Sequence, residues 1–297
     1  MITVLTPTFN RADKLSNLYQ SLCGQTVKDF EWLVVDDGST DDTKEKINDL
    51  RQTADFPILY LYKANGGKHT ALNAGIAVIE NELTFIVDSD DIITEDAIAT
   101  IISYYNRYKE NSRLCGYAYL RCFPDGKING SLFAPDEKIA YYIETRINSG
   151  DLNADKAEVF YTRCLKEFPF PEYPGERFLG EDIVWIRMSL KYQMVHINKA
   201  IYIGDYLTGG LTENRRKHNL AAPVGCMNRA EEYMRKELKL IYRFKGAVQF
   251  IVYGKFAGFR SLSLLKRAKH KALVLIAYLP AMLLYLKWRS VKNDSKP

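Results

Sequence analysis

Hydrophobic and polar positions alternate in short blocks along the first hundred residues. Four runs rich in β-branched and aromatic residues predict buried strands, and they span residues 2–5, 31–35, 58–62 and 84–87. Between them, apolar positions recur every three or four residues, which predicts helices; the clearest set is Leu15, Leu18, Tyr19 and Leu22. Strands that alternate with helices are typical of a parallel sheet covered by helices. We therefore predict an α/β fold with a mostly parallel central sheet.

The pattern becomes mixed after residue 110. Strand-like runs occur at 117–122, 157–162 and 195–202, and residues 181–190 have a helical pattern. Residues 168–180 are rich in Pro, Gly and aromatic side chains, so we expect an ordered loop over a site. Beyond residue 228 the chain is helical and basic, which predicts a helical C-terminal extension.

That extension contains one long apolar segment, residues 272–286, in which fifteen consecutive residues are uncharged. A membrane-spanning helix needs about twenty such residues, and Pro280 interrupts this one. Basic residues flank it on both sides: Lys266, Arg267, Lys269, Lys271, Lys287, Arg289 and Lys292. Anionic headgroups attract such residues, so we expect an in-plane or re-entrant membrane anchor. The alternative is a helix buried in a C-terminal bundle.

The charge of the chain is unevenly divided. The formal net charge of +5 comes from 41 Lys and Arg against 36 Asp and Glu. Residues 1–212 carry 22 basic and 31 acidic residues, whereas residues 213–297 carry 19 basic and 5 acidic residues. An acidic body that can hold a cation is therefore joined to a basic region that should bind an anionic surface.

Cysteine usage and the N-terminal residues bear on the compartment. The five cysteines include no C-x-x-C pair and no His at zinc-site spacing, which predicts unpaired thiols in a reducing cytoplasm. The N-terminal residues are strand-like and lack the features of a secretion signal. We therefore expect a cytoplasmic protein.

The strongest candidate site is the acidic end of the strand at 84–87. Asp88, Ser89, Asp90 and Asp91 follow this strand, where open α/β sheets bind ligands. Carboxylates this close repel one another unless a cation neutralises them, and hard oxygen ligands suit Mg²⁺ or Mn²⁺. The alternative is a capping cluster for the next helix.

Three other strand ends carry polar turns. The first can hold a flat base, and the acids of the second can accept from a nucleobase or ribose, unless they only cap the next helix. The third, Asn-Gly-Gly-Lys, precedes a helix N-terminus, which suits a phosphate. The residues concerned are Pro7, Thr8, Asn10, Asp36, Asp37 and Lys68. Together the four turns predict one pocket for a nucleotide diphosphate.

The order of these motifs resembles that of family 2 glycosyltransferases with the GT-A fold. The segments that carry the resemblance are Pro-Thr-Phe-Asn-Arg, Val-Val-Asp-Asp-Gly-Ser-Thr, Asn-Gly-Gly-Lys and Val-Asp-Ser-Asp-Asp. The similarity is close over residues 1–110 and weakens towards residue 215. It implies a nucleotide site, commonly for uridine, at Pro7, Thr8, Asn10, Asp36, Asp37, Lys68, Asp88 and Ser89. In this site Asp88 would contact the ribose. Asp90 would ligate the Mn²⁺ or Mg²⁺ that bridges the diphosphate.

The resemblance also assigns later residues. Glu181 and Asp182 match an acid pair of the family in which Asp182 would be the catalytic base; on its own, the pair is typical of a helix N-terminus. Gly209 and Gly210 match a turn that can close over donor or acceptor. Many relatives have a His near this turn, and the nearest one downstream here is His218.

The activity implied is a metal-dependent, inverting transfer of a sugar from a nucleotide-diphosphate donor, commonly a UDP-sugar, to a hydroxyl group. The acceptor would be a glycan or lipid-linked intermediate of polysaccharide biosynthesis. We expect a catalytic domain over residues 1–215, with a nucleotide-binding half to 110 and an acceptor half from 111. Residues 216–297 would bind the anionic inner face of the cell membrane, and we expect no nucleic acid partner.

Two alternatives remain open on the sequence. A sugar-phosphate nucleotidyltransferase shares the architecture and metal dependence, but it normally has a Gly-rich loop with Arg and Lys after the first strand. A non-catalytic protein could instead bind a nucleotide sugar, or bind nucleic acid through the basic region, where aromatic residues alternate with cations. Retention of Asp88, Asp90 and Asp182 favours an enzyme.

Overall fold

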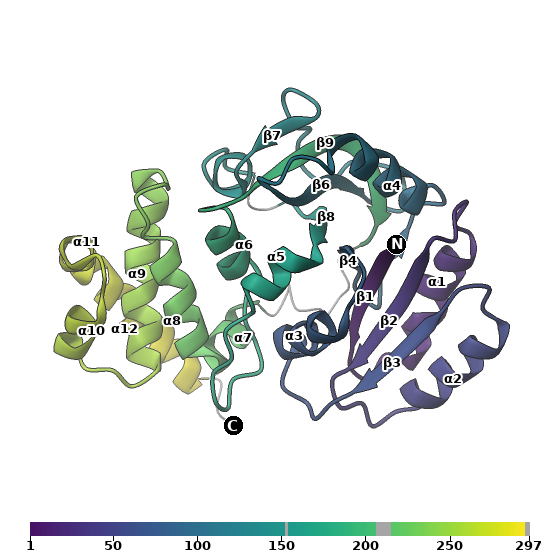
Figure 1. Cartoon of the computed structure of the whole chain (residues 1–297). Helices are drawn as coiled ribbons and strands as arrows, with labels where there is room; N and C mark the ends of the chain where they lie inside the picture. Colours follow the sequence, from purple (N-terminus) through teal and green to yellow (C-terminus); the bar gives the residue numbers. More distant parts are fainter. Residues whose placement is uncertain (152–153, 206–214, 295–297) are drawn as a thin grey trace. The chain divides into compact units, whose positions relative to one another are not determined.

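The computed structural model describes residues 1–151, 154–205 and 215–294, with side chains up to residue 290 (Figure 1). The chain forms two compact units. The first comprises Met1–Phe170 and Arg187–Thr208, and the second comprises Pro171–Ile186 and Gly209–Pro297.

The first unit begins with a parallel sheet. Strands β1 (Ile2–Thr8), β2 (Phe30–Asp36), β3 (Ile58–Tyr62) and β4 (Leu83–Ile86) pair in the order β3-β2-β1-β4, all in parallel. Helices α1 (Ala12–Cys23), α2 (Thr43–Thr53) and α3 (Lys68–Val78) connect them. Every residue of β1 is buried, as expected for a strand covered on both faces. The predicted β/α alternation is therefore confirmed.

The sheet continues with mixed pairing. Strand β8 (Lys156–Tyr161) runs antiparallel to β4 and to β6 (Leu114–Cys122), and β6 runs parallel to β9 (Gln193–Ile203). The short strands β5 (Ile92–Ile93) and β7 (Lys138–Ala140) pair antiparallel with β9. The helical elements here are α4 (Ala97–Tyr108), η1 (Ile143–Ile147) and α5 (Thr162–Glu167). The predicted parallel order thus holds for the first four strands, and the later half is mixed.

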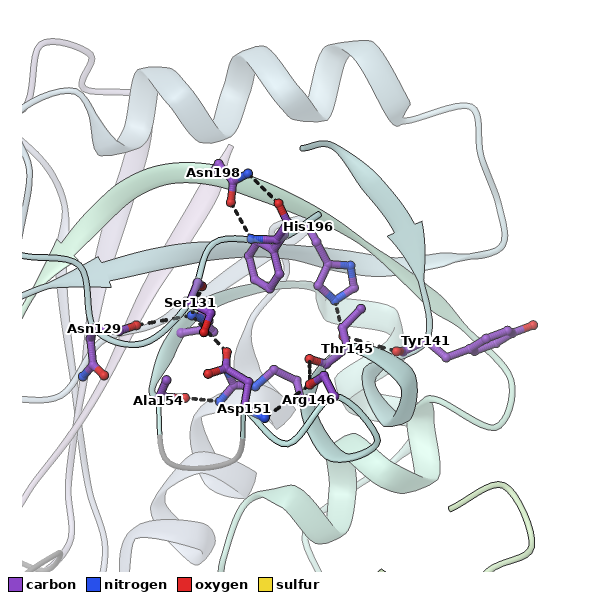
Figure 2. A network of polar contacts seen from close by, with 12 residues as sticks. Asn129, Ser131, Tyr141, Thr145, Arg146, Asp151, Ala154, His196 and Asn198 are labelled. Atoms are coloured by element: carbon purple, nitrogen blue, oxygen red, sulfur yellow. Dashed lines mark hydrogen bonds and ion pairs between the residues drawn. The ribbon is translucent and has the colours of Figure 1, made fainter. Parts of the chain in front are cut away.

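The segment between β6 and β8 is fixed by a buried polar network (Figure 2). The side chain of Lys156 is fully buried; its Nζ donates to the carbonyls of Asn129 (3.3 Å) and Ser131 (2.9 Å) and lies 3.3 Å from a carboxylate oxygen of Asp151. Buried lysines need such partners because an unpaired buried charge is costly. These contacts tie the irregular segment between β6 and β8 to Lys156, the first residue of β8.

His196 of β9 belongs to the same network. Its Nδ1 lies 3.1 Å from the Lys138 carbonyl of β7, and its Nε2 lies 2.7 Å from Thr145 Oγ1 of η1. A carbonyl only accepts, so Nδ1 carries the proton and Nε2 accepts from the threonine hydroxyl. Burial lowers the pKa of His196 to about 4, so the imidazole is neutral at pH 7.

The second unit is helical. Its elements are the first residues of α6 (Asp182–Met188), then α7 (Arg215–Ala221), α8 (Pro223–Glu232), α9 (Leu240–Phe256), α10 (Ser261–Arg267), α11 (Lys271–Ile276) and α12 (Tyr278–Asp294). Its core is built around buried residues of α8 and α9, among them Met227, Phe250 and Ile251. This confirms the predicted helical character of the C-terminal extension.

The apolar segment 272–286 divides between two environments. A break at Ala277 separates α11 from α12, and Val274, Ala277 and Ala281 are buried in the helical core. The opposite side is exposed: Leu275, Ile276, Leu279, Leu283 and Leu286. We call these five residues the apolar face. Within the part of the chain that the structure describes, no helix is long and apolar enough to cross a membrane.

Candidate active site

The carboxyl ends of β1, β2 and β4 lie side by side in the sheet. Thr8 and Asp36, the last residues of β1 and β2, are register partners. Beyond them, the Asp37 amide donates to the Thr8 carbonyl at 2.9 Å, and the Val87 amide donates to the Leu5 carbonyl at 3.0 Å. The turns after these three strands therefore leave the sheet at one edge, where open α/β sheets bind ligands.

Asp37 connects the end of β2 to the turn before α3. Its Oδ1 accepts from Lys63 Nζ (2.7 Å) and the Gly66 amide (2.9 Å), and its Oδ2 accepts from the Gly67 amide (2.6 Å). Gly67 has a φ of 95°, which favours glycine. Asp37 is thus buried and bound by its own chain, and it fixes the Gly-Gly turn that leads to Lys68.

The neighbouring Asp36 is buried as well. It accepts from the Ser39 amide (2.7 Å) and from the hydroxyl of Tyr60 (2.7 Å). Burial and the contact with Asp36 raise the pKa of Tyr60 well above its usual range, so Tyr60 donates as a neutral phenol. Asp36 therefore fixes the turn after β2, and the next helix, α2, begins only at Thr43.

Asn10 joins the turns after β1 and β2. Its backbone N–H donates to Ser39 Oγ at 2.8 Å, and its side-chain Oδ1 accepts from the backbone N–H of Thr40 at 2.8 Å. Pro7 and Thr8 are buried next to this junction. Thr8 Oγ1 is also without a hydrogen-bond partner among the described residues, which is unusual for a buried hydroxyl.

Two cations face the acids after β4. Lys68 Nζ at the start of α3 lies 2.6 Å from Asp88 Oδ1, and Arg11 Nη1 lies 2.6 Å from Asp90 Oδ1. Burial by itself would raise the pKa of Asp88, but the charges of Lys68, Arg121 and Arg11 together lower it, and Lys68 contributes most. The structure thus brings the predicted phosphate residue Lys68 directly to the predicted ribose residue Asp88.

The side chains of Tyr202 and Arg121 bind the turn that carries Asp88 and Asp91. Tyr202 Oη accepts from the Asp88 amide (3.0 Å) and donates to Asp91 Oδ2 (2.7 Å). Arg121 Nη2 also donates to Asp91 Oδ2 at 3.0 Å, and its guanidinium lies 4.2 Å from the centre of the Tyr202 ring. Burial raises the pKa of Asp91 to about 6. Ser89 and Asp91 of the same turn are both buried. The acidic turn is therefore fixed by its packing as well as by hydrogen bonds.

Asp182 lies in the second unit, at the first residue of α6. Arg229 of α8 binds it with two hydrogen bonds, from Nε to Oδ1 and from Nη2 to Oδ2 (2.5 Å), and Tyr233 Oη donates to Oδ2 at 2.5 Å. Burial alone would raise the pKa of Asp182, but Arg229, Tyr233 and Arg215 together lower it, and Arg229 contributes most. Glu181 directly precedes it, whereas Gly209 and Gly210 lie outside the described residues.

Comparison with known proteins assigns the chain to a family. The family described as "Glycosyl transferase family 2" matches residues 3–145. Glycosyltransferase GlyG of Streptococcus pneumoniae is 30% identical over 221 residues, which cover 71% of this chain and 72% of GlyG. The chain belongs to glycosyltransferase family 2. A second relative of this glycosyltransferase is a GalNAc(5)-diNAcBac-PP-undecaprenol beta-1,3-glucosyltransferase of Campylobacter jejuni, 28% identical over 72% of this chain and 69% of the relative.

Solved structures share the fold of this family 2 glycosyltransferase. TarS 1–349 of S. aureus in complex with UDP-GlcNAc matches with a TM-score of 0.59 and 19% identity, over 93% of this chain and 79% of TarS. The mannosyltransferase PcManGT of Pyrobaculum calidifontis, solved with GDP-Man and Mn²⁺, matches with a TM-score of 0.59 and 16% identity, over 99% and 88% of the two chains. The predicted GT-A fold is therefore confirmed.

The acids of this glycosyltransferase fit a metal that binds together with its substrate. Among the residues that the structure describes, no three His, Cys, Asp or Glu side chains form a metal cluster. Mg²⁺, however, is usually held by one or two carboxylates together with substrate phosphates. Asp88 and Asp90 supply such oxygens, and the partly exposed Arg11 can leave Asp90 towards solvent.

Sequence reasoning found the acids of this glycosyltransferase but missed their partners. Arg121 and Tyr202 lie at the ends of two strands that the pattern did predict, yet nothing in the pattern indicated that these strand ends meet behind the acids. Arg229 and Tyr233 lay in a region interpreted as a membrane-binding extension. His218 stacks on Phe178, with ring centres 5.7 Å apart.

Proposed function

We propose that this family 2 glycosyltransferase transfers a sugar from a UDP-sugar to a hydroxyl group of a glycan or lipid-linked acceptor, with inversion at the anomeric carbon. The observation that carries the proposal is the cluster at the carboxyl ends of β1, β2 and β4. There a turn fixed by Asp37 leads to Lys68, and Lys68 contacts Asp88 within the motif that contains Asp90.

The donor side follows from this cluster. The unpartnered hydroxyl of Thr8 and the exposed ring of Phe9 suit a nucleobase, which offers both a polar edge and a flat face. Lys68 at the start of α3 suits the diphosphate, because a helix N-terminus and an ammonium group both attract anions. Pro7, Asn10, Asp36 and Ser89 would shape this site through the backbone and the turns, and Asp88 would bind the ribose.

The metal would be held by Asp90, with Asp88 beside it. A bound Mn²⁺ or Mg²⁺ supplies positive charge that stabilises the departing diphosphate. Arg11 pairs with Asp90 and Lys68 with Asp88, so two cations lie beside the acids, where they would attract the phosphates of the donor. Solved structures with the same fold support this interpretation, since TarS is in complex with UDP-GlcNAc and PcManGT with GDP-Man and Mn²⁺.

The chemical step requires a base for the acceptor. Asp182 is ionised because its pKa is lowered, so its carboxylate can take the proton of an acceptor hydroxyl as the oxygen attacks the anomeric carbon. The bond to the diphosphate breaks on the opposite side of the sugar, and an α-linked donor yields a β-glycoside. Glu181, Gly209 and Gly210 would line the path of donor or acceptor.

A lipid-linked acceptor and binding to an anionic membrane are part of the same proposal. The Campylobacter relative is named for an undecaprenol-linked substrate. The second unit exposes the apolar face on α11 and α12, and the basic residues around it are also exposed: Lys266, Arg267, Lys269, Lys271, Lys287 and Arg289. This combination suits a helix pair that lies in the plane of an anionic membrane.

The function is tested with the full chain, a panel of nucleotide sugars and Mn²⁺. We expect a UDP-sugar to raise the melting temperature, and we expect release of the nucleoside diphosphate with an acceptor present. Asp182→Asn should lower transfer by about 10²–10⁴-fold, the usual contribution of a general base, with donor-dependent stabilisation retained. Glu172→Gln, an exposed acid on the preceding loop, is the matched control.

Two results would contradict the proposal. Full transfer by Asp182→Asn would remove the assigned base. Release of pyrophosphate instead of a nucleoside diphosphate would favour the nucleotidyltransferase alternative.

A further inference from the structure

The carboxylate of Asp182 has an unusually complete set of donors from its own unit. Arg229 binds both oxygens through the two nitrogens on one side of its guanidinium, and Tyr233 adds a third hydrogen bond to Oδ2. The side chains of Asp182 and Arg229 are 14% and 12% exposed, so the pair is largely shielded from water. A bidentate pair of this kind fixes the plane of the carboxylate as well as its charge.

The three hydrogen bonds do not fill every acceptor position of the Asp182 carboxylate. A carboxylate has about four lone-pair positions, two on each oxygen. Oδ2 receives Arg229 and Tyr233, which fill both of its positions, whereas among the described residues Oδ1 receives Arg229 alone. The arrangement thus reserves one position on Oδ1 for a further hydrogen bond, which is what a base needs to receive a hydroxyl proton.

The chain before Asp182 is adapted to the pair. A Cβ atom on Gly180 would lie 2.9 Å from Asp182 Oδ1 and 2.8 Å from Arg229 Nε. Both distances are shorter than normal contacts, so only glycine leaves room for the pair at this position. The loop is anchored to α8 a second time, because Glu176 accepts from the amides of Val224 and Gly225, both at 2.7 Å.

The charged and titratable groups that act on Asp182 come from two further helices. Arg229 on α8 has the largest lowering effect on its pKa, followed by the hydrogen bond from Tyr233, and Arg215 on α7 adds a smaller effect. Cys226 on α8 is also near, but burial raises the pKa of its thiol to about 12, so it is neutral. Arg229 and Tyr233 are therefore the groups that keep Asp182 ionised against the cost of burial.

We propose that Arg229 and Tyr233 are positioning residues for the reaction: they orient Asp182 so that only Oδ1 faces the acceptor hydroxyl, and they hold it in the ionised form. The proposal rests on the proposed function, because it takes Asp182 as the base. It gives the helical second unit a role in the reaction, because Arg229 of α8 then holds the base in place.

The test compares pH profiles of transfer at saturating donor for the full chain and its variants. In Arg229→Gln the carboxylate loses its cation, its pKa rises, and the acid limb of kcat/KM for the acceptor should move up by about 1–3 pH units. Arg229→Lys should restore part of this shift through its charge, yet keep a lowered kcat because a single ammonium cannot bind both oxygens. Tyr233→Phe should give a smaller upward shift. The donor KM should stay within about twofold in all three.

The matched control is Arg235→Lys. Arg235 pairs with Glu232, three residues before it, in the same unit. Its pH profile should equal that of the unchanged chain. Melting temperatures of all variants separate a general loss of folding from a change in the base.

Each outcome decides the proposal. An upward shift of the acid limb in Arg229→Gln and Tyr233→Phe, absent in Arg235→Lys, supports it. An unchanged profile in both variants overturns it while leaving the proposed function intact, provided that Asp182→Asn is inactive. If Arg229→Gln does not fold, Tyr233→Phe decides alone, because it removes only a hydroxyl group. Full transfer by Asp182→Asn overturns the base assignment and this inference together.

Discussion

Asp37 fixes the turn before α3 through several hydrogen bonds, a structural role that its position in a short motif does not indicate. Its carboxylate takes one ammonium and two backbone amides, and all three donors lie between β3 and α3. Hydrogen bonds to a charged acceptor are stronger than neutral ones. A single side chain therefore sets the shape of the turn that presents Lys68.

We predict that Asp37→Asn lowers the free energy of unfolding by about 2–4 kcal/mol, because an amide cannot neutralise Lys63 and offers one acceptor oxygen where three donors need partners. Urea denaturation at pH 7 measures this, together with a fall in donor affinity. Asp49→Asn, an exposed acid on α2, should change stability by less than about 0.5 kcal/mol. Equal stability of the two variants would show that Asp37 is not a structural centre of the turn.

Asp182 illustrates the same principle in the second unit. Its neighbours fill three of its acceptor positions and fix its protonation state. At the scale of single residues, the acids of this glycosyltransferase are thus defined by the donors around them, and the residue type alone does not distinguish a base from a turn residue.

At the scale of elements, the second half of the first unit depends on polar contacts between short pieces. Strand β7 and the π-helical turn η1 both contact β9 through His196, whose side chain is fully buried. Such short elements have little apolar surface of their own. A neutral imidazole that donates on one side and accepts on the other holds them together.

This arrangement predicts a pH dependence. The pKa of His196 is about 4 in the folded chain and about 6.5 in an unfolded one, so the unfolded state binds more protons between these values. Stability from His196 is therefore complete above pH 6.5 and falls as the pH drops towards 4, by at most about 3 kcal/mol. Urea midpoints between pH 4 and pH 7 measure the effect.

The variant His196→Gln isolates this contribution, because glutamine can both donate and accept but does not titrate. Asp91 acts in the opposite direction over the same range, since its pKa is raised to about 6 and its protonated form stabilises the fold as the pH falls. The difference between variant and unchanged chain cancels Asp91. If this difference is constant with pH, His196 is not the group that titrates.

At the scale of the whole molecule, the charge asymmetry of the chain corresponds to an exposed surface in the second unit. The apolar face consists of five large aliphatic side chains spaced so that they share one side of α11 and α12. The opposite side of the same helices packs in the helical core. One side of the segment is therefore buried in the helical core, and the other is exposed, so its binding to a membrane stays a prediction.

We predict that the full chain binds phosphatidylglycerol vesicles and that Leu275→Ser, Leu279→Ser and Leu283→Ser together weaken binding at least about tenfold, because less apolar area enters the membrane. Co-sedimentation at low and high salt measures it, and salt should weaken binding as well. The matched control replaces Leu59, Val78 and Leu132, exposed in the first unit, by Ser. Equal binding of the two triple variants would exclude the apolar face as the contact.

Much of the fold and of the donor site could be predicted from the sequence. The strand at 58–62 has the predicted bounds, and the apolar positions Leu15, Leu18, Tyr19 and Leu22 of α1 are all buried. Local periodicity determines these elements because covered strands and amphipathic helices each require a fixed spacing of apolar residues. The donor motifs were found for the same reason, since each is a short segment at the end of such a strand.

Local periodicity could not identify the residues that bind Asp88 and Asp182. Tyr202 lies 114 residues from Asp88, and Arg229 lies 47 residues from Asp182, so no local pattern connects them. The boundary expected at residue 215 stays a prediction, and in the structure residues 171–186 belong to the same unit as the C-terminal helices. The division of charge at residue 212 did not show this connection.

The sequence by itself determined the order of strands and helices, the acidic and basic halves and the residues at the strand ends, because these depend on neighbours within a few positions. Only the tertiary structure decided which donors meet which acids: Lys68 at Asp88, Arg11 at Asp90, and Arg229 with Tyr233 at Asp182. The physical reason is that hydrogen bonds and ion pairs act over about 3 Å in space, whatever the separation along the chain.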